Sequence, residues 1–259
     1  MSRANAPEPN QFPSDRPVAV DAALDPKLIS FDVFGTLISV RDSSYDAFRS
    51  ILRDGGRPDI DVKAFWEFWE ERNIAHYWEA YRPYKEICEL SLAEAYLHFG
   101  IHGRTTLIQR YFEAFGNFRA YPDVRPTLEV LSRIYRLAVV SNIDDDLLAA
   151  TPLHHDFDLV CTAERARGYK PDGTLFRYLI ERSGGGVDDI LHAGQSQFTD
   201  MVGGKPLGLT IAWINRRGIE LNASVPRPDF IFQDIASLIP LLDGNAPNHD
   251  QRKPQGGKV

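Results

Sequence analysis

Side chains that can carry out covalent chemistry lie at four points along this 259-residue chain, each at or after the end of a short apolar segment. They are Asp32, Ser141 with Asn142, Lys170, and Asp200. Together they supply a carboxylate, a hydroxyl with an amide, an ammonium and a second carboxylate. A covalent-catalysis site needs such a set: a nucleophile, a cation to steady it, and hydrogen-bond donors for an anionic substrate. We therefore expect these residues to form one catalytic site.

The apolar segments that precede these residues predict a parallel β-sheet. Their apolar residues run continuously rather than alternating with polar ones, which suits strands that are buried on both faces. Helical patterns separate them, and this alternation is typical of a doubly wound, mostly parallel, Rossmann-like α/β fold. Ligands of such a fold bind beyond the carboxyl ends of the strands. The predicted strands are 28–32, 136–141, 158–161, 190–193 and 209–214, and the predicted helices lie near 124–134, 145–150, 172–183 and 198–205.

The interval between the first two strands is far longer than a simple crossover, which takes about a dozen residues or more. It contains four helical stretches, near 43–54, 61–79, 84–99 and 104–118, so we expect an inserted helical cap. Both ends of the chain are too polar and Pro-rich or Gly-rich to bury a core, so we expect disordered tails. The predicted division is a tail at 1–26, an α/β core at 27–42 and 121–242, a helical cap at 43–120, and a second tail at 243–259.

Composition excludes several classes of protein. The formal net charge is −7, whereas nucleic-acid-binding domains usually carry a basic face, so we expect no nucleic-acid partner. No apolar run reaches the ~18 residues of a membrane span and no secretory signal is visible, so we expect a cytoplasmic protein without a membrane partner. The two cysteines, Cys88 and Cys161, form neither a disulfide framework nor a Cys-x-x-Cys metal site. A small-molecule partner is expected, and the sequence leaves a homodimer open.

Four motifs in a fixed order carry a resemblance to a known enzyme family. They contain Asp32, Ser141, Lys170 and Asp200 and span the predicted core. The chain in this respect resembles the haloacid dehalogenase superfamily, which places a helical cap after its first motif. The resemblance implies a hydrolase with an aspartate nucleophile. The motifs are Phe31-Asp32-Val33-Phe34-Gly35-Thr36-Leu37, Val140-Ser141-Asn142, Tyr169-Lys170-Pro171 and His192-Ala193-Gly194-Gln195-Ser196 through Asp200.

Two positions in these motifs separate branches of the superfamily. Its phosphatases carry an acid/base Asp two residues after the nucleophile, and here that position is Phe34. A phenyl ring cannot donate a proton, which removes a contribution typically worth about 10²–10⁴-fold. The first acidic residue of the superfamily's magnesium site is Gln195 here, which leaves few oxygen ligands for a hard cation. The pattern resembles the L-2-haloacid dehalogenase branch, which attacks carbon and uses no metal, so we expect no cofactor, with Mg²⁺ as the alternative.

The resemblance also implies a mechanism. Asp32 would displace a leaving group from a saturated carbon of a small carboxylate and form an aspartyl ester. Water, activated near Asp200 and Lys170, would then hydrolyse the ester. The nearby Lys170 cation would lower the pKa of Asp32 and hold it ionised. The substrate-binding residues implied in this way are Thr36, Ser141, Asn142, Phe34, Gln195, Ser196, Arg72 and Trp69.

One part of the dehalogenase pattern differs in this chain. That branch has an Arg in the cap, close after a Trp, which holds the departing halide. The residue after Trp69 is instead Glu70, and Arg72 is the nearest cation. We therefore predict a 2-haloacid dehalogenase-like hydrolase whose leaving group is a halide or a similar group. The alternatives are a magnesium-dependent small-molecule phosphatase and a non-catalytic binding protein of the same superfamily.

Overall fold

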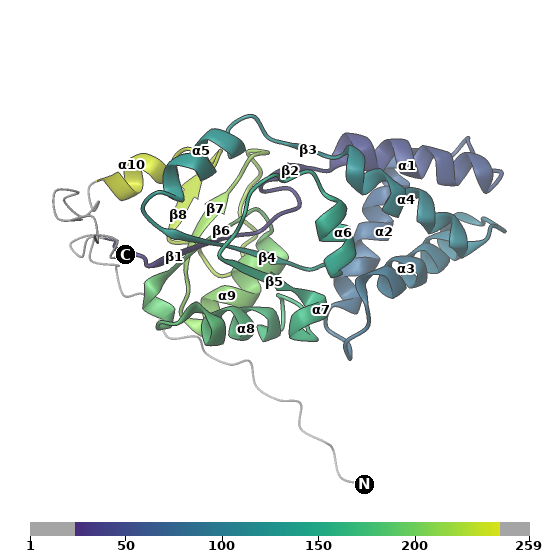
Figure 1. The fold of residues 1–259 in the computed structure, drawn as a ribbon. Coiled ribbons are helices and arrows are strands. Elements are labelled where there is room, and N and C mark those ends of the chain that lie inside the picture. The colour runs from purple at the N-terminus through teal and green to yellow at the C-terminus, as the bar shows by residue number, and fades with distance from the viewer. Residues whose placement is uncertain (1–23, 244–259) are drawn as a thin grey trace, which may run out of the picture.

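A computed structural model describes residues 24–243, and its centre is a six-stranded parallel sheet (Figure 1). The strand order is β5-β4-β1-β6-β7-β8, so the sheet extends from β1 in both directions. The predicted doubly wound α/β fold is confirmed. The predicted tails at 1–26 and 243–259 lie almost entirely outside the described residues. The strands are β1 (Leu28–Phe31), β4 (Arg136–Ser141), β5 (Leu159–Thr162), β6 (Ile190–Gly194), β7 (Thr210–Ile214) and β8 (Phe230–Phe232).

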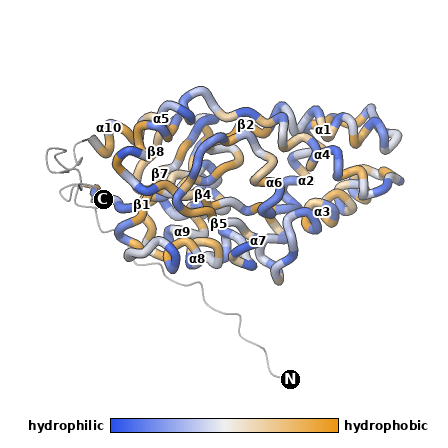
Figure 2. Tube along the Cα trace, viewed as in Figure 1, coloured by the Kyte–Doolittle hydropathy of each residue, from blue (hydrophilic) through white to orange (hydrophobic). Residues whose placement is uncertain are grey.

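The central strand β1 shows why the apolar runs are continuous. Its residues pair with 136–139 of β4 on one side and with 190–193 of β6 on the other. All four residues of β1 are buried, because both faces of the sheet are covered. The strands accordingly form an apolar band through this part of the molecule (Figure 2). The strand order reverses at β1, and the carboxyl end of such a strand is where open α/β sheets bind their ligands.

The edge strand β8 is missing from the predicted strands. It has only three residues, and Ile231 is exposed while Phe230 and Phe232 are partly buried. An edge strand with solvent nearby lacks the long apolar run that marks a strand buried on both faces. Its parallel pairing with β7 widens the sheet by one strand.

Helices cover both faces of the sheet (Figure 1). The predicted helix at 145–150 is observed with the same bounds, whereas the predicted helix at 198–205 divides into several short turns. The first of these is a π-helical turn, a geometry that is frequent at functional sites, and it contains Asp200. The elements are α5 (Val124–Leu131), α6 (Asp145–Ala150), α7 (Ala163–Ala166), α8 (Thr174–Ser183), η3 (Val187–Asp189), η4 (Gln197–Met201), α9 (Val202–Gly204), η5 (Lys205–Leu207) and α10 (Leu238–Asp243).

A helical group lies beyond one end of the sheet (Figure 1). The chain enters it after β2 (Ile38–Ser39) and leaves through β3 (Arg119–Ala120), and these two strands pair antiparallel. Helices therefore form where the sequence predicts them, while the division of the chain into a core and a cap at 43 and 120 stays a prediction. The helical group consists of α1 (Arg41–Asp54), α2 (Val62–His76), α3 (Tyr84–Phe99), η1 (Thr105–Ile108), α4 (Gln109–Glu113) and η2 (Ala114–Asn117).

Aromatic side chains hold the helical group together. The Phe48 ring of α1 lies 4.8 Å from Trp69 of α2 and 5.5 Å from Tyr111 of α4, between ring centroids. The Trp69 indole N–H donates to the Cys88 carbonyl of α3 at 3.1 Å. Such rings bury a large apolar area, and a buried indole needs a partner for its N–H. Among residues 24–243, no helix has the length and apolar character to cross a membrane.

Two contacts tie the helical group to the loops of the sheet. The Asp144 carboxylate, just before α6, accepts hydrogen bonds from the backbone N–H groups of Tyr84 and Lys85, at 2.8 and 3.0 Å. A carboxylate at a helix N-terminus is favourable because the positive end of the helix dipole lies there. The Tyr169 hydroxyl donates to the Arg82 carbonyl at 2.8 Å. The loops after β4 and β5 are therefore held against the start of α3.

Gly203 in α9 packs closely against the Lys170 carbonyl, and substitution of this glycine tests the importance of that contact. A Cβ at Gly203 would lie 1.7 Å from that oxygen. We expect Gly203→Ala to lower the free energy of unfolding by about 1–3 kcal/mol, because the backbone must shift to admit the methyl group. Urea unfolding followed by circular dichroism measures the change. Gly186→Ala, whose Cβ would meet nothing within 4 Å, is the control, and an equal loss in both variants would contradict this packing.

Candidate active site

A buried ion-pair network joins the three predicted catalytic residues. The Lys170 ammonium lies 2.5 Å from Asp32 Oδ1 and 2.9 Å from Asp200 Oδ1. Lys170 exposes 2% of its side chain and Asp200 none, so the cation and both carboxylates are withdrawn from water. A single cation that bridges two carboxylates offsets part of the cost of burying them. The structure thus brings these three side chains together beyond the carboxyl end of β1.

The loop after β1 fixes the Asp32 carboxyl. The Asp32 N–H donates to the Ala193 carbonyl at 2.9 Å, which continues the pairing of β1 with β6 by one residue. The Thr36 hydroxyl donates to Asp32 Oδ2 at 2.6 Å and accepts the Gln195 N–H at 2.9 Å. The turn between them requires Gly35, whose φ is +92° and whose Cβ would lie 2.5 Å from Gln195 Oε1. Each oxygen of Asp32 therefore has its own donor.

A second row of hydrogen bonds fixes Asp200. Nε2 of His192, in β6, lies 3.3 Å from Asp200 Oδ1, and Nδ1 lies 2.9 Å from the Ser30 hydroxyl in β1. The Ser196 N–H donates to Asp200 Oδ2 at 2.9 Å. The sequence indicates no role for His192 or Ser30, because a polar residue within an apolar strand gives no sign of its partner. These hydrogen bonds from the strands and the following loop fix the position of the Asp200 carboxylate, which in turn positions the Lys170 ammonium.

The two carboxylates have different electrostatic environments. Burial raises the pKa of Asp200, but attraction by Lys170 and the hydrogen bond with His192 outweigh it, so the pKa lies well below its ordinary value. Burial lowers the pKa of Lys170, but the two carboxylates more than compensate and raise it. For Asp32, burial and the Asp200 charge prevail over Lys170 and Thr36, and the pKa is raised. The prediction that Lys170 would leave the pKa of Asp32 lowered is therefore wrong: Lys170 acts in that direction, but burial is the larger effect.

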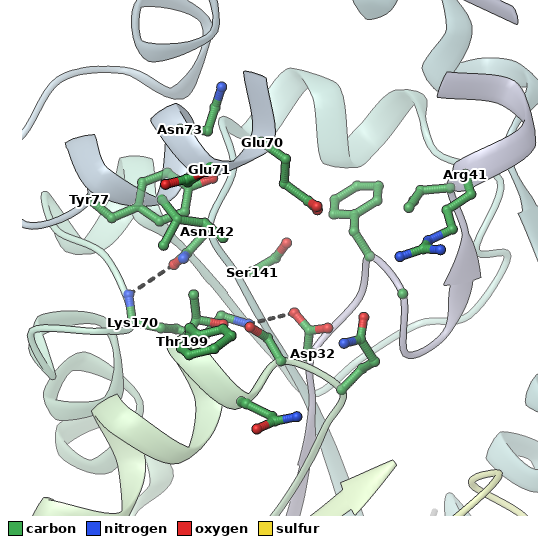
Figure 3. Close-up of a pocket in the computed structure, with 18 of the residues that line it drawn as sticks. Asp32, Arg41, Glu70, Glu71, Asn73, Tyr77, Ser141, Asn142, Lys170 and Thr199 are labelled. Carbon is green, nitrogen blue, oxygen red and sulfur yellow. Dashed lines mark hydrogen bonds and ion pairs between the residues drawn. The ribbon is translucent and has the colours of Figure 1, made fainter. Parts of the chain in front are cut away.

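A cavity of about 640 Å³ lies between the sheet and the helical group. Asp32 and Lys170 lie on its sheet side and face residues of α2 across it (Figure 3). Three exposed apolar side chains, Trp78, Phe198 and Ile219, form part of its rim. The volume is in the range of small-molecule sites, about 300–1,000 Å³. The predicted site residues that line the cavity are Asp32, Phe34, Trp69, Ser141, Asn142, Lys170, Gln195 and Ser196.

Three predicted site residues lie outside the cavity lining. Thr36 and Asp200 are buried behind the carboxyl and the ammonium that they hold, and they act through them. Arg72 pairs with Glu94 of α3, which also binds His76 at 3.0 Å. The structure therefore does not bring Arg72 to the other predicted site residues.

Five charged residues that line the cavity were not predicted as site residues. They are Arg41 at the start of α1, Glu67, Glu70 and Glu71 on α2, and Arg217 after β7. Burial raises the pKa of Glu70 to about 7, although the two arginines oppose this. The sequence signal for Glu70 was its place directly after Trp69. Arg41 and Arg217 gave no comparable signal, because they reach the cavity only through the fold.

Phe34 forms an apolar wall beside Asp32. Its ring lies edge-on at 5.4 Å from Phe115 and 6.2 Å from Phe118, between centroids. Two residues after Asp32, the chain thus presents an apolar ring packed on the helical group. This position cannot transfer a proton to a leaving group.

The side chains at the site do not fit a divalent metal ion. Among residues 24–243, no three or more His, Cys, Asp or Glu side chains are grouped so that they could hold a metal. The carboxylates of Asp32 and Asp200 both contact the Lys170 ammonium, which occupies the position between them that a metal cation would need. Gln195 offers only a neutral amide, and hard cations prefer about six oxygen ligands.

Comparison with known proteins identifies the family. A family model described as haloacid dehalogenase-like hydrolase matches residues 26–208, so the chain belongs to the haloacid dehalogenase-like hydrolases. The predicted family resemblance is confirmed, and the protein is a hydrolase.

Among individual relatives, the chain is similar to (S)-2-haloacid dehalogenase 4A of Burkholderia cepacia, 25% identical over 225 residues that cover 83% of this chain and 94% of the relative. It is also 25% identical over 224 residues to haloacetate dehalogenase H-2 of Moraxella sp. (strain B), with 83% and 96% covered. The structure of L-2-haloacid dehalogenase from Xanthobacter autotrophicus with chloropropionic acid covalently bound has the same fold. Its TM-score is 0.73 at 20% identity, and the match covers 85% of this chain and 100% of that chain.

The buried network predicts a large effect when one carboxylate is removed. We expect Asp200→Asn to lower the free energy of unfolding by about 3–5 kcal/mol, because Lys170 stays buried with one partner fewer. Because the folded pKa of Asp200 is lowered, its contribution is complete above the unfolded value of about 3.9 and is lost as the pH falls through the folded pKa. Urea unfolding at neutral pH measures the difference.

The exposed ion pair between Asp46 and Arg49 provides the control for this variant. Asp46→Asn should change the free energy of unfolding by less than about 1 kcal/mol. If Asp200→Asn were as mild as this control, Asp200 would not be the partner that holds Lys170.

Proposed function

We propose that this hydrolase displaces a leaving group from a saturated carbon of a small carboxylic acid, such as a 2-haloacid, through an aspartyl ester. One observation carries the proposal. The buried Asp32 carboxyl faces the cavity beside a protonated Lys170, and the position two residues later is the Phe34 ring rather than a proton donor. The similarity to dehalogenases of 2-haloacids and haloacetate supports it.

The environment of Asp32 suits attack on carbon. Burial raises its pKa, which makes the ionised oxygen a stronger base and a stronger nucleophile than a carboxylate in water. Lys170 and Thr36 each hold one oxygen and fix the direction of the carboxyl. One oxygen forms a bond to the substrate carbon, and the leaving group departs with the electron pair of the bond that breaks.

Water then regenerates the enzyme. It attacks the carbonyl carbon of the ester on Asp32, and the Lys170 ammonium stabilises the negative charge that develops on the carbonyl oxygen. The acyl–oxygen bond breaks and the oxygen from water stays on Asp32. One water proton goes to the departing oxygen, the other is released to solvent, and the hydroxy acid leaves. Asp200 is a positioning residue in this step, because it contacts Lys170 and does not line the cavity.

The cavity also offers groups for the substrate carboxylate. Ser141 lines the cavity together with Asp32, and the Arg41 guanidinium reaches toward the cavity from the side of α1 (Figure 3). Arg217 adds a second cation to the lining. Guanidinium groups bind carboxylates through charge-assisted hydrogen bonds, which favours small anionic substrates. We propose that these groups bind the substrate without a metal cofactor, in a cytoplasmic enzyme.

We expect the full-length protein to release chloride from (S)-2-chloropropionate and no phosphate from p-nitrophenyl phosphate, with EDTA leaving the rate unchanged. Ion chromatography and p-nitrophenol absorbance measure the two products. Asp32→Asn should abolish chloride release, because an amide is not a nucleophile, and Asp46→Asn should retain it. Phosphate release that depends on magnesium would replace this proposal with a phosphatase. Binding without any turnover would replace it with a binding protein.

The aspartyl ester has a separate test. We expect a single turnover in H₂¹⁸O to place the label on Asp32, because water attacks the acyl carbon and its oxygen remains on the enzyme. Mass spectrometry of the peptide that contains Asp32 measures the label, and a peptide that contains Asp200 is the control. Label found only in the product would mean that water attacks the substrate directly.

A further inference from the structure

Glu70 is a carboxyl group in the cavity that the mechanism above does not use. It lies on α2, lines the cavity and is half-buried. Its carboxyl points from α2 into the space that Asp32 faces from the other side (Figure 3). Among residues 24–243 it has no hydrogen-bond or ion-pair partner. Glu94, by contrast, contacts both Arg72 and His76. A carboxyl that is placed in a cavity and bound to nothing is available to a ligand.

The surroundings of Glu70 raise the pKa of its carboxyl group, so that it can carry a proton at neutral pH. Burial raises its pKa to about 7, which means that both the neutral and the ionised forms are populated there. This is the condition under which a carboxyl works best as a general acid or base. The charged and titratable groups around it are Arg41 from α1, Glu67 three residues earlier on α2, Glu71 next to it on α2, Tyr77 directly after α2, Tyr111 from α4, and Arg217 from the loop after β7.

Glu70 lies across the cavity from Asp32, on the side where a leaving group would depart. In a displacement at carbon, the leaving group departs on the side opposite the attacking oxygen, which here is the side of α2. A halide leaves as a stable anion without a proton, and an ionised carboxylate would repel it. A leaving oxygen or nitrogen atom is basic and departs readily only with a proton. The geometry suits a leaving atom of this second kind.

We propose that Glu70 holds the proton that the leaving atom takes, and that the preferred substrates are small carboxylic acids whose reacting carbon lies in a strained ring with oxygen or nitrogen. The inference rests on the proposed function, since Asp32 must be the nucleophile. The proposed substrates contain a strained ring because an unstrained ether or amine is a poor leaving group even with a proton. Arg41 and Arg217 are placed to bind the substrate carboxylate near the same wall.

Every bond and proton in this reaction is accounted for. An Asp32 oxygen forms the new carbon–oxygen bond, the ring bond breaks, and its electron pair goes to the ring heteroatom, which takes the proton from Glu70. Water then hydrolyses the ester; its oxygen stays on Asp32, one proton goes to the product hydroxyl, and the other returns to Glu70. Where a ring nitrogen arrives protonated, ionised Glu70 pairs with that same proton. The net reaction adds one water and releases no acid, whereas dehalogenation releases a proton.

Three substrates of similar size test the role of Glu70 in the full-length protein: oxirane-2-carboxylate, aziridine-2-carboxylate and (S)-2-chloropropionate. We expect Glu70→Gln to lower kcat/KM for oxirane-2-carboxylate by about 10²–10⁴-fold, because the amide has no acidic proton. Opening of the aziridine ring should also slow, and chloride release should be unchanged or faster. Glu113→Gln, which alters an exposed carboxyl on α4, is the matched control.

The pH profile separates proton donation from a structural role. Wild-type kcat/KM for oxirane-2-carboxylate should fall as the pH rises through about 7, because Glu70 loses its proton there. Glu70→Gln should lack this decline, and Glu70→Asp should retain it. A merely structural effect would lower the rates for all three substrates alike and leave the profile unchanged in shape.

The outcomes distinguish this inference from the proposed function. Ring opening that is unaffected by Glu70→Gln would overturn the role of Glu70. Turnover of (S)-2-chloropropionate alone, abolished by Asp32→Asn and indifferent to Glu70→Gln, would overturn the inference and leave the proposed function standing. Turnover of none of the three substrates would overturn both.

Discussion

A single buried ammonium organises the candidate site. Lys170 lies between Asp32 and Asp200, and both carboxylates are withdrawn from water together with it. Burying three charges is costly unless each has a partner and the remaining hydrogen bonds are made. Thr36 and His192 make those bonds, and they come from the loop after β1 and from β6. The neighbouring strands β1 and β6 thus form the scaffold that keeps the Lys170 ammonium between the carboxylates of Asp32 and Asp200.

Much of the fold, and the meeting of three charged side chains at the candidate site, could be predicted from the sequence. Strands buried on both faces have continuous apolar runs, so the four inner strands and the edge strand β5 were found, while the shorter edge strand β8 was not. Asp32, Lys170 and Asp200 could be placed together because the carboxyl ends of parallel strands share one edge of the sheet. The π-helical turn around Asp200 could not, because its local sequence also fits an ordinary helix.

The other side of the cavity was harder to predict for a physical reason. An α-helix turns by about 100° per residue, and sequence periodicity does not say which face meets a distant loop. Arg72 and Glu70 are two residues apart on α2, yet Arg72 pairs with Glu94 and Glu70 lines the cavity. The net direction of the Asp32 pKa was missed for a similar reason, since the extent of burial is a property of the whole fold.

The hydrogen bonds from Asp144 to the start of α3 have a mechanical consequence. The helical group is joined to the sheet covalently through β2 and β3, and a second time where Asp144 holds the N–H groups of Tyr84 and Lys85. The loop that carries Ser141 lies beside this second connection, so a displacement of the helical group against the sheet must also strain the hydrogen bonds of Asp144. The Tyr169–Arg82 hydrogen bond and the ion pair between Lys85 and Asp146 lie next to it, so removal of the Asp144 carboxylate would weaken this connection without removing it.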